Sequence, residues 1–421
     1  MSATTVTPLR RAALAPLPVA ALGLLSAFPP FAADMYLPGL PAIARDLRTT
    51  PAGVQLTITA LLLGMAAGLF VTGALSDRYG RRATLVPCLA LCAASGAACA
   101  LAPDLGTLIG ARFVQGITGA ACLVIARAVV SDAAEGREAA RVFGLMMTVL
   151  GVAPVVAPLV GGIVAATAGW RAVFWALAAL TLLMLAAALV AVPETPPGRR
   201  RPVREPGASV RGLLLDRPFL AYALAFALAF GALTAYLAAS PFVLRTLFGL
   251  STEAFSLVLA VYALALALVA TANAHLVYRH TPHRLLEAGL TVLLAASAIL
   301  CGLALTGALT LVACLLSLLA AAASLGLVLG NACALALGRA PRAAGTAAVF
   351  LAAAQFTAGA ITAPLAGIGG DRAATAMALV MTVCALVALF VVATMRTTLD
   401  VTRRERLDTG RIGIGSCDQP R

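Results

Sequence analysis

Two ionisable side chains lie within apolar stretches of the sequence, where a charged group is costly and needs a partner or water. Asp34 is the one acid deep inside such a stretch, and Arg112 lies within another. A charged group is costly in hydrocarbon, so we expect Arg112 to face the protein interior or a wet cavity and to have a partner, for which Asp34 is the natural candidate. Burial raises the proton affinity of a carboxylate and a nearby arginine lowers it. Movement of either group would therefore make Asp34 take up or release a proton.

Two structural interpretations compete with this proton chemistry. Arg112 could extend to the outer membrane interface, or the two groups could form a permanently buried ion pair. The residues after Arg112 favour an interior position, because polar and small side chains recur at helical spacing and line one face of a helix. This face comprises Arg112, Gln115, Gly119, Cys122 and Ala126.

The elements that position these groups are expected to be membrane-spanning helices. Of the 421 residues, 62% are hydrophobic and 11% are charged, whereas a soluble domain carries about a quarter charged residues. A span needs roughly 20 apolar residues. Such runs lie near residues 14–37, 52–75, 83–102, 105–131, 141–167, 172–193, 218–240, 254–276, 285–306, 309–337, 344–368 and 373–395. The sequence predicts an all-α polytopic protein with twelve helices in the lipid bilayer.

A polar, arginine-rich stretch divides these spans into six plus six. The predicted parts are an N-terminal six-helix bundle over 1–193, a basic cytoplasmic linker over 194–217, a C-terminal bundle over 218–395 and a basic cytoplasmic tail over 396–421. The segment APLVGG at 157–162 recurs as APLAG at 363–367, so the halves look related. Two repeated six-helix halves are a transporter architecture, with the substrate site near the midplane between them.

The net charge of +13 comes from 30 basic residues, all of them arginine. Most lie in short loops between apolar runs, which argues against a nucleic-acid-binding patch. Five fall in loops on one predicted side, at Arg45, Arg48, Arg171, Arg245 and Arg372, and two lie inside the fourth span. By the positive-inside rule, this asymmetry predicts a multi-pass membrane protein with both termini in the cytoplasm.

The loop between the second and third spans reads GALSDRYGRR over residues 73–82. It resembles the G-x-L-x-D-R-x-G-R-R hallmark of the major facilitator superfamily. The resemblance implies a gate motif made of Gly73, Asp77, Arg78, Gly80, Arg81 and Arg82, together with Asp132. Asp77 is placed to pair with a cytoplasmic arginine or to face the N-terminus of the helix that starts near Gly345. A solvated basic loop that only sets topology is the alternative.

Further segments resemble one branch of this superfamily, the twelve-span drug:proton antiporters of the bicyclomycin/chloramphenicol-resistance (Bcr/CflA) type. They are ADMYLPGLP at 33–41, RFVQGITG at 112–119, ARAVVSD at 126–132, GWR at 169–171, PET at 193–195 and RAAGTA at 342–347. The resemblance covers the chain apart from about its last twenty residues. It implies that Asp34 and Arg112 are the proton-linked acid and the essential arginine of that branch.

The fifth span carries a proline-glycine pattern that is similar to the antiporter motif G-x-x-x-G-P-x-x-G-G. Pro158, Gly161 and Gly162 match it and Pro154 adds a second proline, but Ala157 replaces a glycine. In the superfamily this motif is proposed to seal the cavity against proton leak. A kinked packing helix is the alternative, because prolines bend helices and glycines permit close packing.

The substrate surface is weakly specified by the sequence. Its candidate residues are polar or aromatic side chains at Tyr36, Gln115, Tyr222, Phe226, Phe230, Tyr236 and Gln355. Aromatic side chains on a membrane helix more often pack against neighbours or lipid. Apart from Asp34, no deep acid is present to bind a cation. We therefore predict an apolar cavity for small, largely neutral, drug-like compounds such as chloramphenicol or bicyclomycin.

The sequence predicts a proton-coupled exporter rather than an enzyme. No G-x-x-x-x-G-K-[ST] loop for ATP is present, so an ion gradient must drive transport. The three histidines lie together at 275–283 and form no catalytic cluster within the spans, and the nine cysteines form no CxxC pair. No cofactor or metal is expected, and nothing demands an oligomer, so we expect a monomer. A metabolite exporter or a proton-coupled uptake symporter of the same fold is the alternative.

Overall fold

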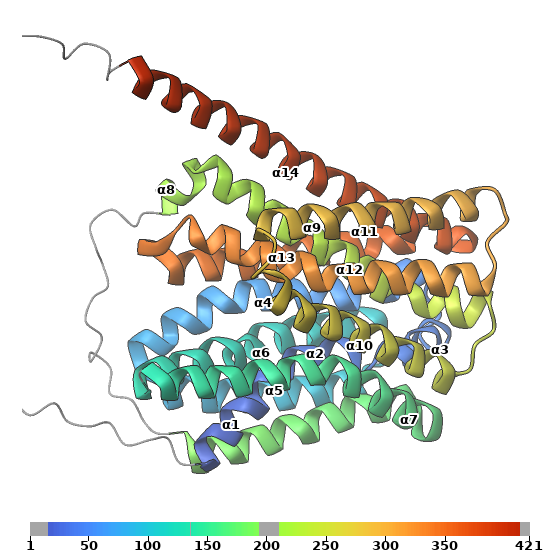
Figure 1. Cartoon of the computed structure of the whole chain (residues 1–421). Helices are drawn as coiled ribbons and strands as arrows, with labels where there is room; N and C mark the ends of the chain where they lie inside the picture. The colour runs from blue at the N-terminus through green and yellow to red at the C-terminus, as the bar shows by residue number, and fades with distance from the viewer. Residues whose placement is uncertain (1–15, 135, 193–209, 413–421) are drawn as a thin grey trace, which may run out of the picture.

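The computed structural model describes residues 16–134, 136–192 and 210–412, and every regular element in these ranges is a helix (Figure 1). The main helices are α1 (Pro16–Ser26), α2 (Phe28–Asp34), α3 (Leu40–Asp46), α4 (Pro51–Tyr79), α5 (Arg81–Ala100), α6 (Leu105–Ala133), α7 (Gly136–Ala191), α8 (Val210–Leu215), α9 (Arg217–Ser240), α10 (Thr252–Leu276), α11 (Pro282–Leu305), α12 (Leu311–Gly338), α13 (Ala344–Gly367) and α14 (Ala373–Ile412). Short turns of other helical types are η1 (Leu37–Gly39), η2 (Pro241–Leu247), η3 (Pro341–Ala343) and η4 (Gly370–Arg372).

The described residues contain eleven helical stretches that are long and apolar enough to cross a membrane. One of them, α7, has 56 residues and breaks at Gly169, whose φ of 81° lies in the left-handed region. Glycine adopts this backbone conformation without the steric penalty that a Cβ atom brings. The break separates α7 into the predicted fifth and sixth spans, so the eleven stretches account for the twelve predicted crossings.

The expected end of the first span, at residue 37, is wrong. The helical stretch runs from Leu17 to Asp46 and is interrupted where α2 gives way to η1 and α3. Prolines at positions 29, 30, 38 and 41 lack backbone N–H groups, so they break the hydrogen-bond ladder of a continuous helix. The segment nevertheless keeps its direction and simply continues beyond the break.

Side-chain caps mark where most of the long helices begin. Thr50 accepts a hydrogen bond from the Gly53 N–H at the start of α4. Asp104 accepts one from Thr107 at the start of α6, at 2.9 Å. Similar caps start α9, α10, α11 and α12 at Asp216, Ser251, Thr281 and Thr310. Each cap satisfies an N–H group that the helix leaves unpaired, so the polar loops fix the helix starts.

The helices run between two ends of the bundle. We call the end at which α4, α10 and α12 finish the arginine-rich end, on the left in Figure 1, and the end at which α4 and α6 begin the far end. Residues 16–192 are called the N-terminal half and residues 210–395 the C-terminal half. Helix α4 of the first half packs along α13 of the second, and the second part of the broken first span, α3, lies near η2.

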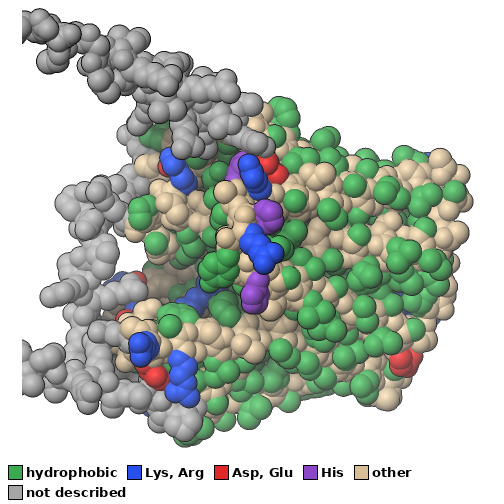
Figure 2. Space-filling view, viewed as in Figure 1, with side chains coloured by type: hydrophobic (Ala, Val, Ile, Leu, Met, Phe, Trp, Pro, Cys, Tyr) green, Lys and Arg blue, Asp and Glu red, His purple; other side chains and the backbone are tan. Residues whose placement is uncertain are grey.

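Hydrogen bonds join the two halves towards the far end. The Gln55 Nε2 atom donates to the Ala238 carbonyl at 2.9 Å, and the Thr59 hydroxyl donates to the Ala360 carbonyl at 2.9 Å. Arg245 donates to the carbonyl of Pro38. At the arginine-rich end, the space-filling view shows a hollow between the halves (Figure 2). A Cβ atom built on Gly345, at the start of α13, would meet nothing within 4 Å. The molecule is therefore closed at the far end and open at the arginine-rich end.

Most of the predicted linker and the last nine residues of the predicted tail fall outside the described ranges. Of the linker over 194–217, the structure describes α8 and the start of α9. The last apolar span, Ala373–Met395, has the predicted bounds, and α14 continues beyond it as a helix to Ile412. Residues 413–421 of the predicted tail lie outside the described residues.

Candidate functional site

The break in the first span lies next to a buried arginine on α6. Arg112 is fully buried, with no exposed surface. Its Nη2 atom donates a hydrogen bond of 2.7 Å to the carbonyl of Ala32, and its Nη1 atom donates one of 2.7 Å to the Gln115 side-chain oxygen. The guanidinium also lies over the Tyr36 ring, 4.1 Å from its centre. An arginine in this position does not reach the membrane interface, so the snorkelling alternative does not describe this structure.

The expected ion pair between Asp34 and Arg112 is not formed in this conformation. Arg112 instead binds the main chain two residues before Asp34, and its Nε atom has no hydrogen-bond partner. The Asp34 carboxylate is partly buried, and no described residue gives it a hydrogen bond or an ion pair. The ion pair is missing because of how the broken helix packs against α6. The helix directs the Ala32 carbonyl, rather than the Asp34 carboxylate, at the Arg112 guanidinium. Asp34 follows two residues after the carbonyl that Arg112 binds.

An aromatic chain connects this arginine to the far end. The Tyr36 ring lies 5.6 Å from the Phe174 ring, which in turn meets the Trp170 ring edge-on at 6.0 Å. The Trp170 Nε1 atom donates to the Asp46 carboxylate at 3.1 Å, and Arg171 forms an ion pair with the same carboxylate. The broken first span thus contacts the second part of α7 at its break, through Tyr36, and at its end, through Asp46.

Glycines of the predicted antiporter helix lie where α7 touches other segments. A Cβ atom on Gly161 would lie 1.7 Å from the carbonyl oxygen of Met35, next to Asp34. A Cβ atom on Gly162 would lie 2.0 Å from the Ser256 hydroxyl on α10 of the other half. Pro154 and Pro158 lie within the same stretch of α7. In this conformation the two glycines let α7 pack against both the segment around Met35 and the C-terminal half.

Replacing Gly161 by alanine is expected to destabilise the protein, because backbone must move to admit the new methyl group. Overpacking of this kind costs about 1–3 kcal/mol. We expect the melting temperature in detergent, followed by fluorescence-detected size-exclusion chromatography, to fall by several degrees. Gly151→Ala is the matched control, since a Cβ atom at Gly151 on the same helix meets nothing within 4 Å. Equal melting temperatures for the two variants would contradict the close approach at Met35.

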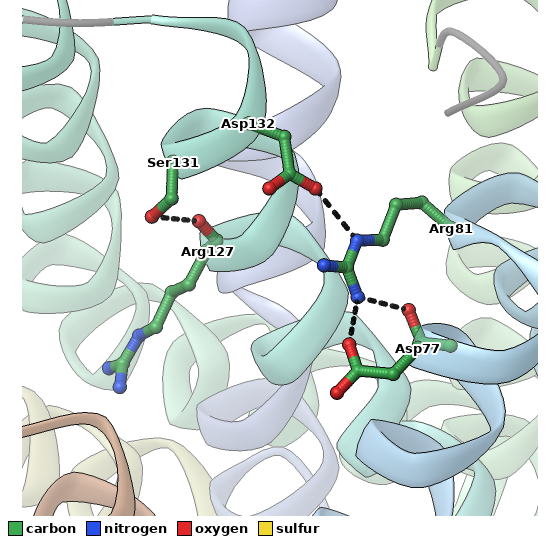
Figure 3. Close-up of polar contacts among 6 residues, drawn as sticks. Asp77, Arg81, Arg127, Ser131 and Asp132 are labelled. Carbon is green, nitrogen blue, oxygen red and sulfur yellow. Dashed lines mark hydrogen bonds and ion pairs between the residues drawn. The ribbon is translucent and has the colours of Figure 1, made fainter. Parts of the chain in front are cut away.

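The predicted gate motif forms a compact ionic cluster at the arginine-rich end (Figure 3). The Arg81 side chain is 6% exposed. Its Nη1 atom donates to the Asp77 carboxylate at 2.8 Å and to the Ser76 hydroxyl at 2.9 Å. Its Nε atom donates to the Asp132 carboxylate at 2.9 Å. Asp77 therefore pairs with an arginine of this end, which was the first of its two expected partners, and the cluster joins α4, α5 and α6.

The remaining residues of the motif support the turn between α4 and α5. Gly80 adopts a φ of 103°, which explains a glycine at this turn. Arg82 donates to the Leu189 carbonyl at 2.6 Å and so ties the turn to the end of α7. The Arg78 guanidinium lies 5.3 Å from the centre of the Tyr79 ring, and Gly73 lies within α4 against Val124 of α6. The solvated-loop alternative does not describe Arg81, although Arg78 belongs to an exposed part of the turn.

The structure brings some of the predicted substrate residues together and separates others. Tyr36 and Gln115 both contact Arg112. Tyr236 is buried against Tyr262, and its hydroxyl has no hydrogen-bond partner. Tyr222 lies at the arginine-rich end, where its hydroxyl is 3.3 Å from the Nδ1 atom of His283, so it is not part of the Arg112 cluster.

The remaining predicted substrate residues, Phe226, Phe230 and Gln355, lie on α9 and α13. Phe230 packs against Phe356, with ring centres 5.9 Å apart. Phe226 and Gln355 are partly buried, on α9 and α13. These helices pack together. Tyr222 and Tyr236 also lie on α9, so this helix pair of the C-terminal half carries five of the seven predicted residues.

Sequence reasoning missed two residues of the Arg112 cluster. The Thr57 hydroxyl lies 3.1 Å from the Tyr36 hydroxyl, from the neighbouring helix α4. Phe174 stacks between Tyr36 and Trp170, and its ring centre lies 5.4 Å from the Arg112 guanidinium. Phe174 lies one helical turn after the GWR segment at 169–171. Its position next to that segment could have indicated that it belongs to the site. Nothing in the sequence distinguishes Thr57 from other threonines in the spans.

The chain resembles known proteins along most of its length. The family model described as Major Facilitator Superfamily matches residues 22–364. An uncharacterized MFS-type transporter, YdgK of Bacillus subtilis (strain 168), is 35% identical over 377 residues, which cover 87% of this chain and 92% of that protein. Multidrug resistance protein MdtL of Escherichia fergusonii is 30% identical over 234 residues, which cover 56% of this chain and 60% of that protein.

Solved transporter structures share the fold at low sequence identity. The POT family transporter PepTSo matches with a TM-score of 0.74 at 14% identity, and the match covers 93% of this chain and 99% of that one. A D-xylose-proton symporter matches with a TM-score of 0.69 at 18% identity over 88% and 96% of the two chains. A bacterial homolog of the lysosomal transporter Spinster, in an inward-facing and occupied conformation, matches with a TM-score of 0.70 at 18% identity over 89% and 94%.

Proposed function

The chain belongs to the Major Facilitator Superfamily and is a multi-pass membrane transporter, not an enzyme, and from this premise we propose that it exports small, largely neutral hydrophobic drugs in exchange for protons. The proposed setting is the bacterial cytoplasmic membrane, with both termini inside. The name of the relative MdtL, a multidrug resistance protein, supports the drug class. The apolar character of the chain supports the neutral, lipophilic side of the proposal.

The observation that carries the proton coupling is the relation between Asp34 and Arg112. An acid without a hydrogen-bond or ion-pair partner among the described residues and an arginine with an unpaired Nε atom belong to one site, held by the bond from Arg112 to Ala32. Protonated Asp34 is stable in the open conformation because it needs no counter-charge. After release of its proton, the carboxylate gains an ion pair by turning towards Arg112. Each conformation would then favour one protonation state.

We infer the orientation of the protein in the membrane from the distribution of its arginines, and from that orientation its conformational state in the transport cycle. The arginine-rich end faces the cytoplasm under the positive-inside rule. The hollow at that end then makes this conformation inward-open, ready to take a drug from the cytoplasm (Figure 2). In the outward-open state, the far-end bonds of Gln55, Thr59 and Arg245 must break. The cluster around Arg81 serves as the latch that meets the C-terminal half when the cytoplasmic end closes.

A proton gradient provides enough free energy for this export. One proton that crosses about 100 mV contributes roughly 2.3 kcal/mol. A gradient of one pH unit adds about 1.4 kcal/mol. One proton per drug molecule could therefore maintain a concentration ratio of roughly several hundredfold.

Growth inhibition in an efflux-deficient bacterium tests the proposal. Cells that express the protein are compared with cells that carry an empty vector, on chloramphenicol, bicyclomycin and a cationic dye. We expect at least fourfold higher inhibitory concentrations for chloramphenicol or bicyclomycin and no change for the dye. Protection against the dye alone would contradict the neutral substrate class. Increased sensitivity to the drugs would indicate uptake and would favour the symporter alternative.

A further inference from the structure

Two arginines, one from each half, bind the broken part of the first span on either side of Asp34. The Nη2 atom of Arg112, on α6 of the N-terminal half, donates to the Ala32 carbonyl at 2.7 Å. The Nη1 atom of Arg245, on η2 of the C-terminal half, donates to the Pro38 carbonyl. The acid therefore lies between two carbonyls that are held by different halves of the molecule. We call residues 32–38 the acid-bearing stretch.

The middle of the acid-bearing stretch is fixed to the N-terminal half. A Cβ atom on Gly161 of α7 would overlap the carbonyl oxygen of Met35. The hydroxyl of Tyr36 lies 3.1 Å from the hydroxyl of Thr57 on α4. Among the described residues, the bond from Arg245 is the one hydrogen bond that reaches this stretch from the C-terminal half. Arg245 is thus the polar link between the acid-bearing stretch and the half that moves away when the far end opens.

The Arg245 guanidinium has no second anchor that would keep it in place if Pro38 moved. It forms no ion pair within the described part of the chain, and its buried Nε atom has no hydrogen-bond partner. The turn that carries it is ordered, because the Phe248 N–H donates to the Val243 carbonyl at 3.2 Å. The position of the guanidinium therefore depends on one main-chain acceptor, which a small displacement of the acid-bearing stretch would remove.

We propose that Arg245 is the positioning residue through which the proton site controls the far-end gate. While the far end is closed, the bonds at Ala32 and Pro38 hold the acid-bearing stretch with Asp34 and Arg112 unpaired. Pairing of these two groups requires the stretch to turn, and this turn breaks the bond to Arg245. An interaction that only one conformation makes favours that conformation, so its loss shifts the balance towards the other. This inference rests on the proton coupling proposed above and adds the step by which loss of the proton opens the far end.

Hydrogen–deuterium exchange of the full-length protein in nanodiscs measures the balance between the two conformations without any drug. Peptides over residues 47–54 report on the far end, and peptides over 73–82 report on the arginine-rich end. Arg245→Gln is expected to speed exchange at the far end and to slow it at the arginine-rich end. The ratio of the two rates should change by about tenfold, as for the loss of one hydrogen bond to a charged group. Arg245→Lys should keep most of the wild-type pattern, because an ammonium also donates to a carbonyl.

Arg45→Gln is the matched control for this experiment. Arg45 is an exposed arginine of the far end, and its Nε atom donates to the Pro41 carbonyl within its own half, at 3.3 Å. Its replacement should leave both exchange rates unchanged. Faster exchange in Arg245→Gln that is confined to the far end would overturn the proposal, because it would show only local loosening. An equal response of Arg45→Gln would also overturn it.

A double-mutant cycle with Asp34→Asn tests the link to the acid. In a mildly alkaline buffer, Asp34→Asn alone is expected to keep the far end more closed, because asparagine forms no ion pair with Arg112. Together with Arg245→Gln, the same change should have little effect, since the acid-bearing stretch is then free to turn in either conformation. Additive effects of the two changes would refute the link.

The cycle also separates this inference from the proposed export. If the two changes are coupled but the growth assay detects no drug export, the link between the acid and the gate stands and the export proposal fails. If export is detected but the two changes are additive, the export proposal stands and the role of Arg245 is refuted.

Discussion

Lysine in place of Arg112 is expected to abolish drug resistance even though the positive charge is kept. Arg112 donates to Ala32 and Gln115 in two directions, and its guanidinium lies over the Tyr36 ring. A lysine ammonium is a compact point charge and cannot reproduce this planar arrangement. A buried acceptor that loses its donor costs about 1–3 kcal/mol. Two such losses would reduce the population of the working site by roughly 30-fold or more.

The measurement is resistance in the efflux-deficient strain at matched membrane levels, with drug binding to the purified variant. Arg141→Lys is the matched control, because Arg141 is 76% exposed and pairs with Glu138 only at 3.7 Å. We expect the control to retain full resistance. If Arg112→Lys is also fully active, then charge alone suffices and the two directed hydrogen bonds are not required for transport.

The sequence predicted the membrane helices well because hydrophobic runs and loop arginines are local properties. The break at Gly169 was recognisable as a loop between two apolar runs, and the turn at Gly80 followed from the motif around it. The extension of the first span to Asp46 was not recognised. Its prolines were read as an end, whereas they only interrupt a segment whose continuation packs against α7 and η2.

The site was predicted in part, for a related reason. The pairing of Asp77 with an arginine follows from spacing, since Arg81 is one helical turn further along the chain. The partner of Arg112 depends on how a broken helix passes α6, and a sequence does not specify which main-chain atom faces a guanidinium. The same holds for Thr57 and Phe174, which reach the cluster from α4 and α7.

Asparagine in place of Asp34 is expected to separate drug exchange from proton-driven transport. Asparagine has nearly the shape of the protonated acid but cannot release a proton. The open conformation should therefore still form, and drug should still bind. In proteoliposomes, we expect pH-gradient-driven accumulation of the drug to fall at least tenfold, while exchange of labelled for unlabelled drug without a gradient is retained.

Asp104→Asn is the matched control for this variant. Asp104 caps α6 at the far end, outside the spans, and asparagine caps a helix about as well as aspartate. Both processes should remain intact in the control. Gradient-driven accumulation that persists in Asp34→Asn would move the coupling to another residue. Loss of both processes in a correctly folded Asp34→Asn protein would instead place Asp34 in drug binding. Only the separated outcome supports an acid that is without a partner when protonated and that pairs with Arg112 after its proton has left.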